Sequence, residues 1–193
     1  IMGLGTDGSA WEEHVQAWAA HYRCILLDNR GTGRSDKPAG PYTTHMLADD
    51  AAGLLEALGL QRAHVVGISM GGAVAQELAL RHPQRVRSAV LVSTWPACEP
   101  YTAEVFRVLA AVRAVTTPAE FTRMVQLLIY APPYYRDAAH IANLAEKQRT
   151  AAEHYAPQEA YVAQGEACIT HNTLDRLSRV QAATLITVGE EDV

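Results

Sequence analysis

The sequence predicts an α/β domain, with a mostly parallel sheet, helices on both faces and a helical segment that interrupts the sheet. Apolar runs of strand length alternate with stretches whose apolar residues recur at helical spacing, and the connections are short. Between about residues 101 and 165 only helical patterns occur, and strand character returns at residues 183–188. The strands are apolar throughout, as expected where helices cover both faces of a parallel sheet.

The first half of the chain supplies most of the predicted sheet. Leu47, Ala51 and Leu55 share one face of a helix that begins at Thr44, and Gly59 is suited to end it. The predicted elements are a helix at residues 11–20, a strand at 24–27, a helix at 44–58, a strand at 63–68, a helix at 71–82 and a strand at 86–92.

The second half of the chain contains a long helical segment. Prolines separate helical patterns at residues 105–115, 119–130 and 137–154, and the last predicted strand comes only at residues 183–188. This segment therefore interrupts the α/β pattern rather than continuing it.

We expect three parts from this pattern. They are the N-terminal part of the core at residues 1–94, a helical cap at 95–165 and an incomplete C-terminal part of the core at 166–193. Because the chain opens on Ile1-Met2-Gly3 as though inside a strand, we expect it to be truncated at its N-terminus. We expect truncation at its C-terminus as well, because no histidine follows the candidate acid Asp192.

Composition excludes several classes of protein. The 193 residues are 49% hydrophobic and 19% charged, as is typical of an ordinary globular domain. With 16 Lys and Arg against 21 Asp and Glu, the net charge is −5, and no basic excess exists to bind a nucleic-acid backbone. No apolar run approaches the length of about 18 residues that a membrane span needs.

The cysteines predict neither a disulfide framework nor a metal site. Cys24, Cys98 and Cys168 are odd in number, and the chain has no C-x-x-C pair and no histidine cluster. We therefore expect no metal, no cofactor and a reducing, cytoplasmic compartment.

One short motif carries the predicted chemistry. The G-x-S-x-G pattern of a nucleophile elbow is matched by Gly67-Ile68-Ser69-Met70-Gly71, which lies between a predicted strand and a predicted helix. So sharp a turn strains the backbone of Ser69 and requires glycine on both sides. The hydroxyl of Ser69 would then lie beside a helix N-terminus, where the N–H of Met70 faces a developing oxyanion. The alternative is a turn of small residues without chemistry.

A nucleophilic serine needs a base and a carboxylate that orients the base. Asp192 is the natural carboxylate because it follows the last predicted strand by one short turn, and Glu190 and Glu191 compete with it. The chain order in this architecture is nucleophile, acid and histidine, yet all eight histidines precede Asp192, with His171 the best placed of them. We therefore expect the base to lie beyond the C-terminus and the 193-residue chain alone to be nearly inactive.

A second motif allows two interpretations. The pattern G-x-G-x-x-G is matched by Gly3-Leu4-Gly5-Thr6-Asp7-Gly8, and Asp28 follows at about the interval of a ribose-binding acid, which is typical of dinucleotide-binding domains. However, Glu12 stands where such a helix needs a small residue, and Asp28 opens a long loop with arginines, which suggests a structural pair. Alternatively, this glycine loop supplies a second oxyanion donor, the backbone N–H of Leu4.

These motifs together resemble the α/β-hydrolase superfamily, and within it the capped branch of esterases, 3-oxoadipate enol-lactonases and carbon–carbon bond hydrolases. The resemblance implies that Ser69 is the nucleophile, Asp192 the acid, and the N–H groups of Leu4 and Met70 the oxyanion hole. Four segments match in order: Met2-Gly3-Leu4-Gly5, the loop at residues 28–36, Gly67-Ile68-Ser69-Met70-Gly71-Gly72 and Gly189-Glu190-Glu191-Asp192.

The resemblance implies a serine hydrolase that acts on a carboxylic ester or lactone through an acyl-serine intermediate and needs no cofactor. Its partner would be a small-molecule substrate, and we expect neither a nucleic acid nor a membrane. The nearest alternative is a carbon–carbon bond hydrolase of the same fold, followed by an acyltransferase or a non-catalytic ligand-binding member. An NAD-binding domain is the remotest alternative.

Overall fold

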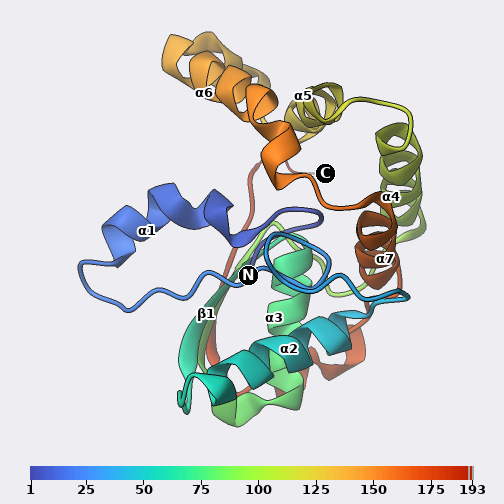
Figure 1. Ribbon diagram of the computed structural model, residues 1–193. Helices are drawn as coiled ribbons and strands as arrows, with labels where there is room; N and C mark the ends of the chain where they lie inside the picture. The colour runs from blue at the N-terminus through green and yellow to red at the C-terminus, as the bar shows by residue number, and fades with distance from the viewer. Residues whose placement is uncertain (191, 193) are drawn as a thin grey trace.

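A parallel sheet forms the centre of the core in the computed structural model, which describes residues 1–190 and 192 (Figure 1). Among these residues three strands pair in the order β1 (Ala63–Ile68), β2 (Val86–Val92) and β3 (Ala183–Thr187). Val90 of β2 lies in register with Val66 on one side and with Leu185 on the other. The parallel sheet and all three of these strands are therefore confirmed.

The N-terminal residue extends the sheet on the free side of β1. The nitrogen of Ile1 donates to the carbonyl oxygen of Val66 at 2.6 Å, and the N–H of Ile68 donates to the carbonyl oxygen of Ile1 at 3.2 Å. This pairing carries the chain directly from the sheet edge into the glycine loop that follows Met2.

The prediction of a strand at residues 24–27 is wrong, because the structure has no strand there. A strand requires a hydrogen-bonded neighbour. In the described part of the chain residues 24–27 make no backbone hydrogen bond. Ile1 already pairs with the free edge of β1, and no other described strand lies beside residues 24–27. The apolar pattern is present, but the partner that would turn it into a strand is not.

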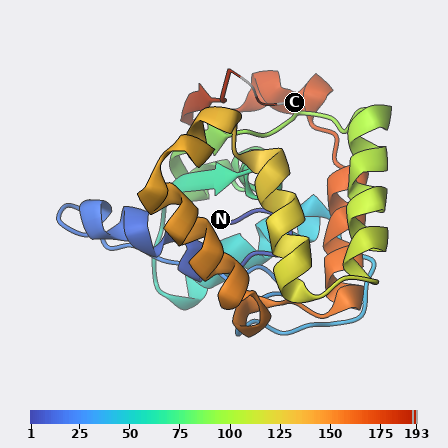
Figure 2. The ribbon, with the colours of Figure 1, turned by 90° about the horizontal axis from the view of Figure 1, so that it is seen from above.

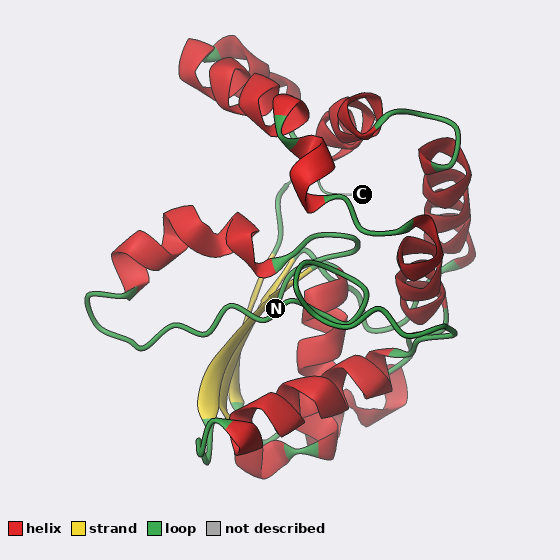
Figure 3. Cartoon of the chain, in the orientation of Figure 1, coloured by secondary structure: helices red, strands yellow, loops and turns green. Residues whose placement is uncertain are grey.

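Helices lie on both sides of the sheet (Figures 1 and 3). On one side α2 (Thr44–Ala57) packs on α3 (Met70–Arg81), whose first three turns are buried. The side chain of Thr43 accepts a hydrogen bond from the N–H of Met46 at the start of α2, and Gly59 follows the helix end with φ +67°. On the other side the helix predicted at residues 11–20 forms as a 3-10 turn, η1 (Gly8–Trp11), followed by α1 (Glu12–Trp18).

Four helices lie together beyond the carboxyl ends of the strands, and Figure 2 looks down onto them. The pattern predicted at residues 137–154 divides into a helix, α6 (Ala138–Arg149), and a 3-10 turn, η4 (Ala151–His154). The last of these helices runs through residue 165, and the division into three parts at residues 94 and 165 stays a prediction. The four helices are α4 (Pro100–Arg113), α5 (Pro118–Ile129), α6 (Ala138–Arg149) and α7 (Gln158–Ile169).

One hydrophobic core joins the sheet, α3 and α7. Met70, Val74 and Leu78 of α3 are almost fully buried, and Ala167 and Cys168 of α7 belong to the same cluster. In contrast, α5 buries only Phe121 and Gln126, and α6 only Leu144. Helix α7 is therefore packed into the core, whereas α5 and α6 lie outside it.

Candidate active site

The turn at Ser69 has the strained geometry expected of a nucleophile elbow. Ser69 stands between β1 and α3 with φ +54° and ψ −123°, in the region that residues with a side chain rarely adopt. A Cβ on Gly67 would lie 2.6 Å from the carbonyl carbon of Gly71, and one on Gly71 would lie 2.7 Å from the carbonyl oxygen of Met2. Both glycines are thus required by close approach of the backbone.

The hydroxyl of Ser69 does not cap the helix that follows it. Serine in this position normally caps the helix by accepting a hydrogen bond from a backbone N–H of the first turn. Ser69 makes no such bond, and its Oγ has no hydrogen-bond partner in the described chain. The hydroxyl therefore remains free to react.

The end of β2 holds the Ser69 turn in place. The N–H of Ser69 donates to the carbonyl oxygen of Val92 at 2.9 Å, and the hydroxyl of Thr94 donates to the carbonyl oxygen of Ser69 at 2.8 Å. Gly72 lets this side chain approach, because a Cβ on Gly72 would lie 2.6 Å from the Cβ of Thr94. Thr94 was not among the predicted site residues, although a polar residue just after a strand beside the elbow was a signal for it.

The glycine loop lies against Ser69. A Cβ on Gly3 would be 3.3 Å from the Cβ of Ser69 and 3.7 Å from its Oγ. The loop is held in turn by Asn29, whose Nδ2 donates to the carbonyl oxygen of Met2 at 3.0 Å. Within the described residues the N–H groups of Leu4 and Met70 have no acceptor. Two uncommitted backbone donors thus stand on the two segments that meet at Ser69.

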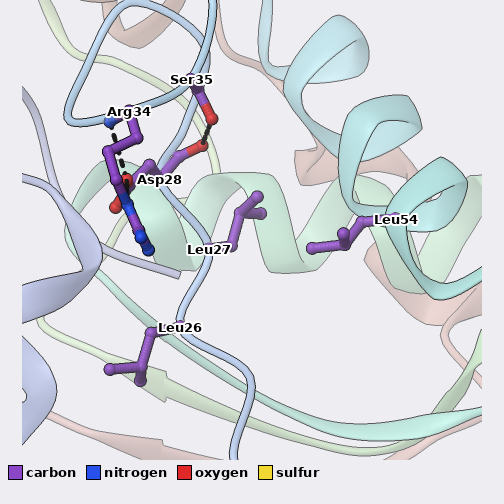
Figure 4. A pocket seen from close by; sticks show the side chains of 6 residues that line it. All are labelled: Leu26, Leu27, Asp28, Arg34, Ser35 and Leu54. Carbon is purple, nitrogen blue, oxygen red and sulfur yellow. Dashed lines mark hydrogen bonds and ion pairs between the residues drawn. The ribbon is translucent and has the colours of Figure 1, made fainter. Parts of the chain in front are cut away.

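Asp28 serves the loops rather than a ligand (Figure 4). One carboxylate oxygen accepts from the N–H of Gly8 at 2.8 Å and the other from the N–H of Arg34 at 2.9 Å. The hydroxyl of Ser35 donates to the carbonyl oxygen of Asp28 at 2.6 Å. An open hollow of about 320 Å³ lies here, lined by Leu26, Leu27, Asp28, Arg34, Ser35 and Leu54. Because both oxygens of Asp28 are engaged, the structure supports the loop-pairing interpretation and not the ribose-binding one.

The predicted carboxylate lies just past the last strand. The backbone N–H of Asp192 donates to the carbonyl oxygen of Gly189 at 3.2 Å, so the two residues close one short turn after β3. The side chains of Asp192 and Glu190 are exposed and form no hydrogen bond in the described chain. Glu191 lies outside the described residues. The role of Asp192 therefore remains a prediction.

All eight histidines lie among the described residues, and within them none forms a hydrogen bond with Ser69. The ring of His171 is buried, with Nδ1 3.0 Å from the hydroxyl of Thr44 and Nε2 3.4 Å from that of Thr173. Burial lowers its pKa to about 4, so the ring is neutral at pH 7. Other histidines are engaged elsewhere: His45 with Glu77, His64 with Ser88, His82 with Asp49, His154 with Asp7, and His14 and His140 against aromatic rings.

Two further properties of the described residues bear on the type of site. They hold no group of three or more His, Cys, Asp or Glu side chains that could bind a metal ion. They also contain no helix of the length and apolar character needed to cross a membrane. What the structure brings together is the turn of Ser69 and the glycine loop, which meet at Gly3.

Comparisons with known proteins show the family to which this elbow and glycine loop belong. The family model of the alpha/beta hydrolase fold matches residues 1–192. The chain is an α/β hydrolase. Membership in this hydrolase family confirms the fold class that the motifs implied, and it sets aside the NAD-binding alternative.

Relatives and solved structures of this hydrolase's family cover most of its length. A protein of Azorhizobium caulinodans, provisionally named carbamate hydrolase RutD, is 30% identical over 190 residues, which are 98% of this chain and 71% of the relative. A hydrolase from Pseudomonas aeruginosa is 30% identical, with a TM-score of 0.84 over 97% of this chain and 69% of its own. The enol-lactonase of Burkholderia xenovorans is 28% identical, with a TM-score of 0.83 over 98% and 70%.

Proposed function

We propose that this α/β hydrolase cleaves a carboxylic ester or lactone through an acyl-serine intermediate, with Ser69 as the nucleophile. The observation that carries the proposal is the free hydroxyl of Ser69, held on a strained turn with the N–H groups of Leu4 and Met70 beside it. A strained residue at a site is stable only when its surroundings enforce it, and here Val92 and Thr94 do so.

The proposed reaction has two stages. In the first, Ser69 Oγ attacks the acyl carbon while a base takes its proton, and the carbonyl oxygen becomes an oxyanion that accepts hydrogen bonds from Leu4 and Met70. The C–O bond then breaks, and the alkoxide leaves with the proton from the base. In the second stage water attacks the acyl-serine and its proton passes to the base. The bond between the acyl carbon and Ser69 Oγ then breaks, Oγ recovers the proton from the base, and the carboxylic acid is released.

The general base is the remaining component of the proposal. We infer that it is a histidine outside the eight in this chain, oriented by Asp192, since among the described residues none of the eight forms a hydrogen bond with Ser69. Removal of the histidine of such a triad lowers turnover by roughly a million-fold. The 193-residue chain alone is therefore expected to bind substrate but to turn it over very slowly.

The relatives favour one further substrate class. A carbamate has an acyl carbon bonded to nitrogen and oxygen, and the same nucleophile and oxyanion donors act on it. The relative from Azorhizobium caulinodans is named for that activity, so carbamate hydrolysis is the second candidate. We also propose that the protein is located in a reducing compartment such as the cytoplasm, because its cysteines, Cys24, Cys98 and Cys168, are free thiols.

A fluorophosphonate probe tests the nucleophile. In the protein expressed from its complete reading frame we expect covalent labelling at Ser69, absent in Ser69→Ala, and turnover of a p-nitrophenyl ester or a lactone that the same change abolishes. A parallel assay with a p-nitrophenyl carbamate separates the two candidates. Ester and lactone turnover that survives Ser69→Ala would disprove the proposed mechanism, and no labelling of a folded protein would favour a non-catalytic binding role.

A further inference from the structure

The glycine loop is clamped from the opposite side by a side chain of α7. Gln164 is 0% exposed, and its Oε1 accepts a hydrogen bond from the N–H of Gly5 at 2.8 Å. Its Nε2 donates to the carbonyl oxygen of Arg30 at 2.7 Å. One buried amide thus joins two loops that follow different segments of the core, and both of its ends are engaged, which fixes its orientation.

An aromatic ring one turn earlier on α7 completes the clamp. Gly5 has φ +69°, and a Cβ on it would lie 2.6 Å from Cδ2 of Tyr161. Tyr161 is itself buried, with its ring edge-on to Phe121 at a centroid separation of 5.6 Å. Because Tyr161 and Gln164 are three residues apart, they lie on the same face of the helix. Gly5 is therefore held by a hydrogen bond and by the surface of a packed ring.

Clamping Gly5 also restricts the neighbouring N–H of Leu4. Peptide units are planar, so only φ and ψ of Leu4 separate the peptide that carries the Leu4 N–H from the one that carries the Gly5 N–H. The turn is closed on its other side by the N–H of Thr6, which donates to the carbonyl oxygen of Gly3 at 3.3 Å. When Gly5 points to Gln164, the direction of the Leu4 N–H is fixed from both ends.

We propose that Gln164 is a positioning residue of the oxyanion hole: through Gly5 it aims the Leu4 N–H at the oxyanion that forms beside Ser69. This inference rests on the proposed function. Gln164 has no free donor or acceptor end for substrate, since Gly5 and Arg30 occupy both. Its removal should weaken the interaction that exists only in the transition state, so kcat should fall while KM changes little.

The chain offers a matched control. Gln126 of α5 is also a buried amide with both ends bonded: its Nε2 donates to the carbonyl oxygen of Leu144 at 3.1 Å, and its Oε1 accepts from Nε2 of Gln148 at 2.7 Å. These partners belong to α6 rather than to the glycine loop. Gln126→Leu therefore removes an equivalent buried hydrogen-bonding pair without touching Gly5.

The test compares Gln164→Leu and Gln126→Leu in the protein expressed from its complete reading frame, with a p-nitrophenyl ester and with thermal unfolding as the check on folding. We expect Gln164→Leu to lower kcat by about 10- to 100-fold, which approaches the loss of one oxyanion donor, with KM within about threefold of the wild type. Gln126→Leu should leave kcat unchanged. Amide hydrogen exchange at Gly5 should become faster in Gln164→Leu alone.

Gln164→Glu keeps the inference testable even where the leucine variant does not fold. A protonated glutamic acid can accept from Gly5 and donate to Arg30, and burial favours the protonated form. We expect activity close to wild type at low pH that declines as the carboxyl ionises. Wild-type kcat in folded Gln164→Leu, an equal loss in both leucine variants, or a wild-type pH profile in Gln164→Glu would overturn the inference. None of these results affects labelling of Ser69, whose absence would overturn the proposed function itself.

Discussion

Replacement of Gly67 by alanine tests whether close backbone approach holds the elbow. The added Cβ would lie 2.6 Å from the carbonyl carbon of Gly71 and 2.8 Å from the nitrogen of Gly72, whereas real Cβ atoms stay at least 3.0 Å from such neighbours. The carbonyl oxygen of Gly71 would lie nearer still, so strand β1 and helix α3 would have to separate by more than about 0.4 Å. Both neighbours are backbone atoms of a buried helix, so no side-chain rotation can relieve the overlap.

Overpacking of this kind typically costs 1–3 kcal/mol of the free energy of unfolding, and the backbone contact places Gly67→Ala at the upper end, about 3 kcal/mol. For a chain of this size that corresponds to a fall in Tm of roughly 6–12 °C. Thermal unfolding followed by circular dichroism measures the change. The same variant should lower esterase turnover, because Ser69 moves with the helix start.

Gly53→Ala is the matched control for this experiment. Gly53 is exposed within α2, and a Cβ there would meet no atom within 4 Å. Alanine is favoured over glycine in a helix, so we expect Gly53→Ala to stabilise the fold by about 0.5–1 kcal/mol. If Gly67→Ala and Gly53→Ala changed Tm equally, the proposed steric role of Gly67 would be refuted.

Three further predictions concern the surroundings of the elbow. Thr94→Val removes the hydrogen bond to the Ser69 carbonyl oxygen, so the free energy of unfolding measured in urea should fall by about 1 kcal/mol and kcat should fall as well. An unchanged kcat would show that the bond does not support Ser69. Arg176→Met removes the bidentate partner of Glu77, whose carboxylate is 0% exposed, while His45 Nε2 still lies 3.0 Å from its Oε1; we expect a cost of about 3 kcal/mol, the lower end of the range for a broken buried pair. Arg107→Met, at an exposed pair with Glu104, should cost under about 0.5 kcal/mol, and similar values for the two variants would contradict the importance of burial. Burial lowers the pKa of His171 from 6.5 to about 4, so the unfolded chain binds a proton at this ring more readily than the folded one. The free energy of unfolding should therefore fall as pH falls from about 6.5 to 4, by roughly 3 kcal/mol in total. His171→Asn should flatten that part of the pH profile of urea unfolding, and an unchanged slope would assign the pH dependence to other groups.

Features of the structure that depend on a local pattern could be predicted from the sequence. Strands β1 and β2 have the predicted bounds, and α2 begins and ends where Thr43 and Gly59 can satisfy its ends. The elbow was predictable because so sharp a strand-to-helix turn requires small residues at fixed offsets from Ser69. These signals lie within a few residues of the structure that they predict.

Features that depend on distant partners were missed. Residues 24–27 have the composition of a strand but lack a neighbour, and α7 lacks an amphipathic pattern because it is buried on several sides, from Ala160 to Cys168. Gln164 contacts Gly5 across 159 positions of the chain, so no local spacing could have indicated it. Because α7 also carries Gln158, Glu159 and Glu166, its polar residues gave no signal that singled out Gln164.

The unequal burial of the four helices beyond the sheet has a consequence for how new specificity can arise. Helix α7 shares the central core and holds the glycine loop, so its substitution is expected to damage the chemistry itself. In contrast, α5 and α6 bury three side chains between them, Phe121, Gln126 and Leu144. We therefore expect the segment at residues 115–150 to tolerate exchange for another sequence, by evolution or by design, while the scaffold that carries Ser69 is retained, provided that an aromatic ring still packs on Tyr161 where Phe121 does.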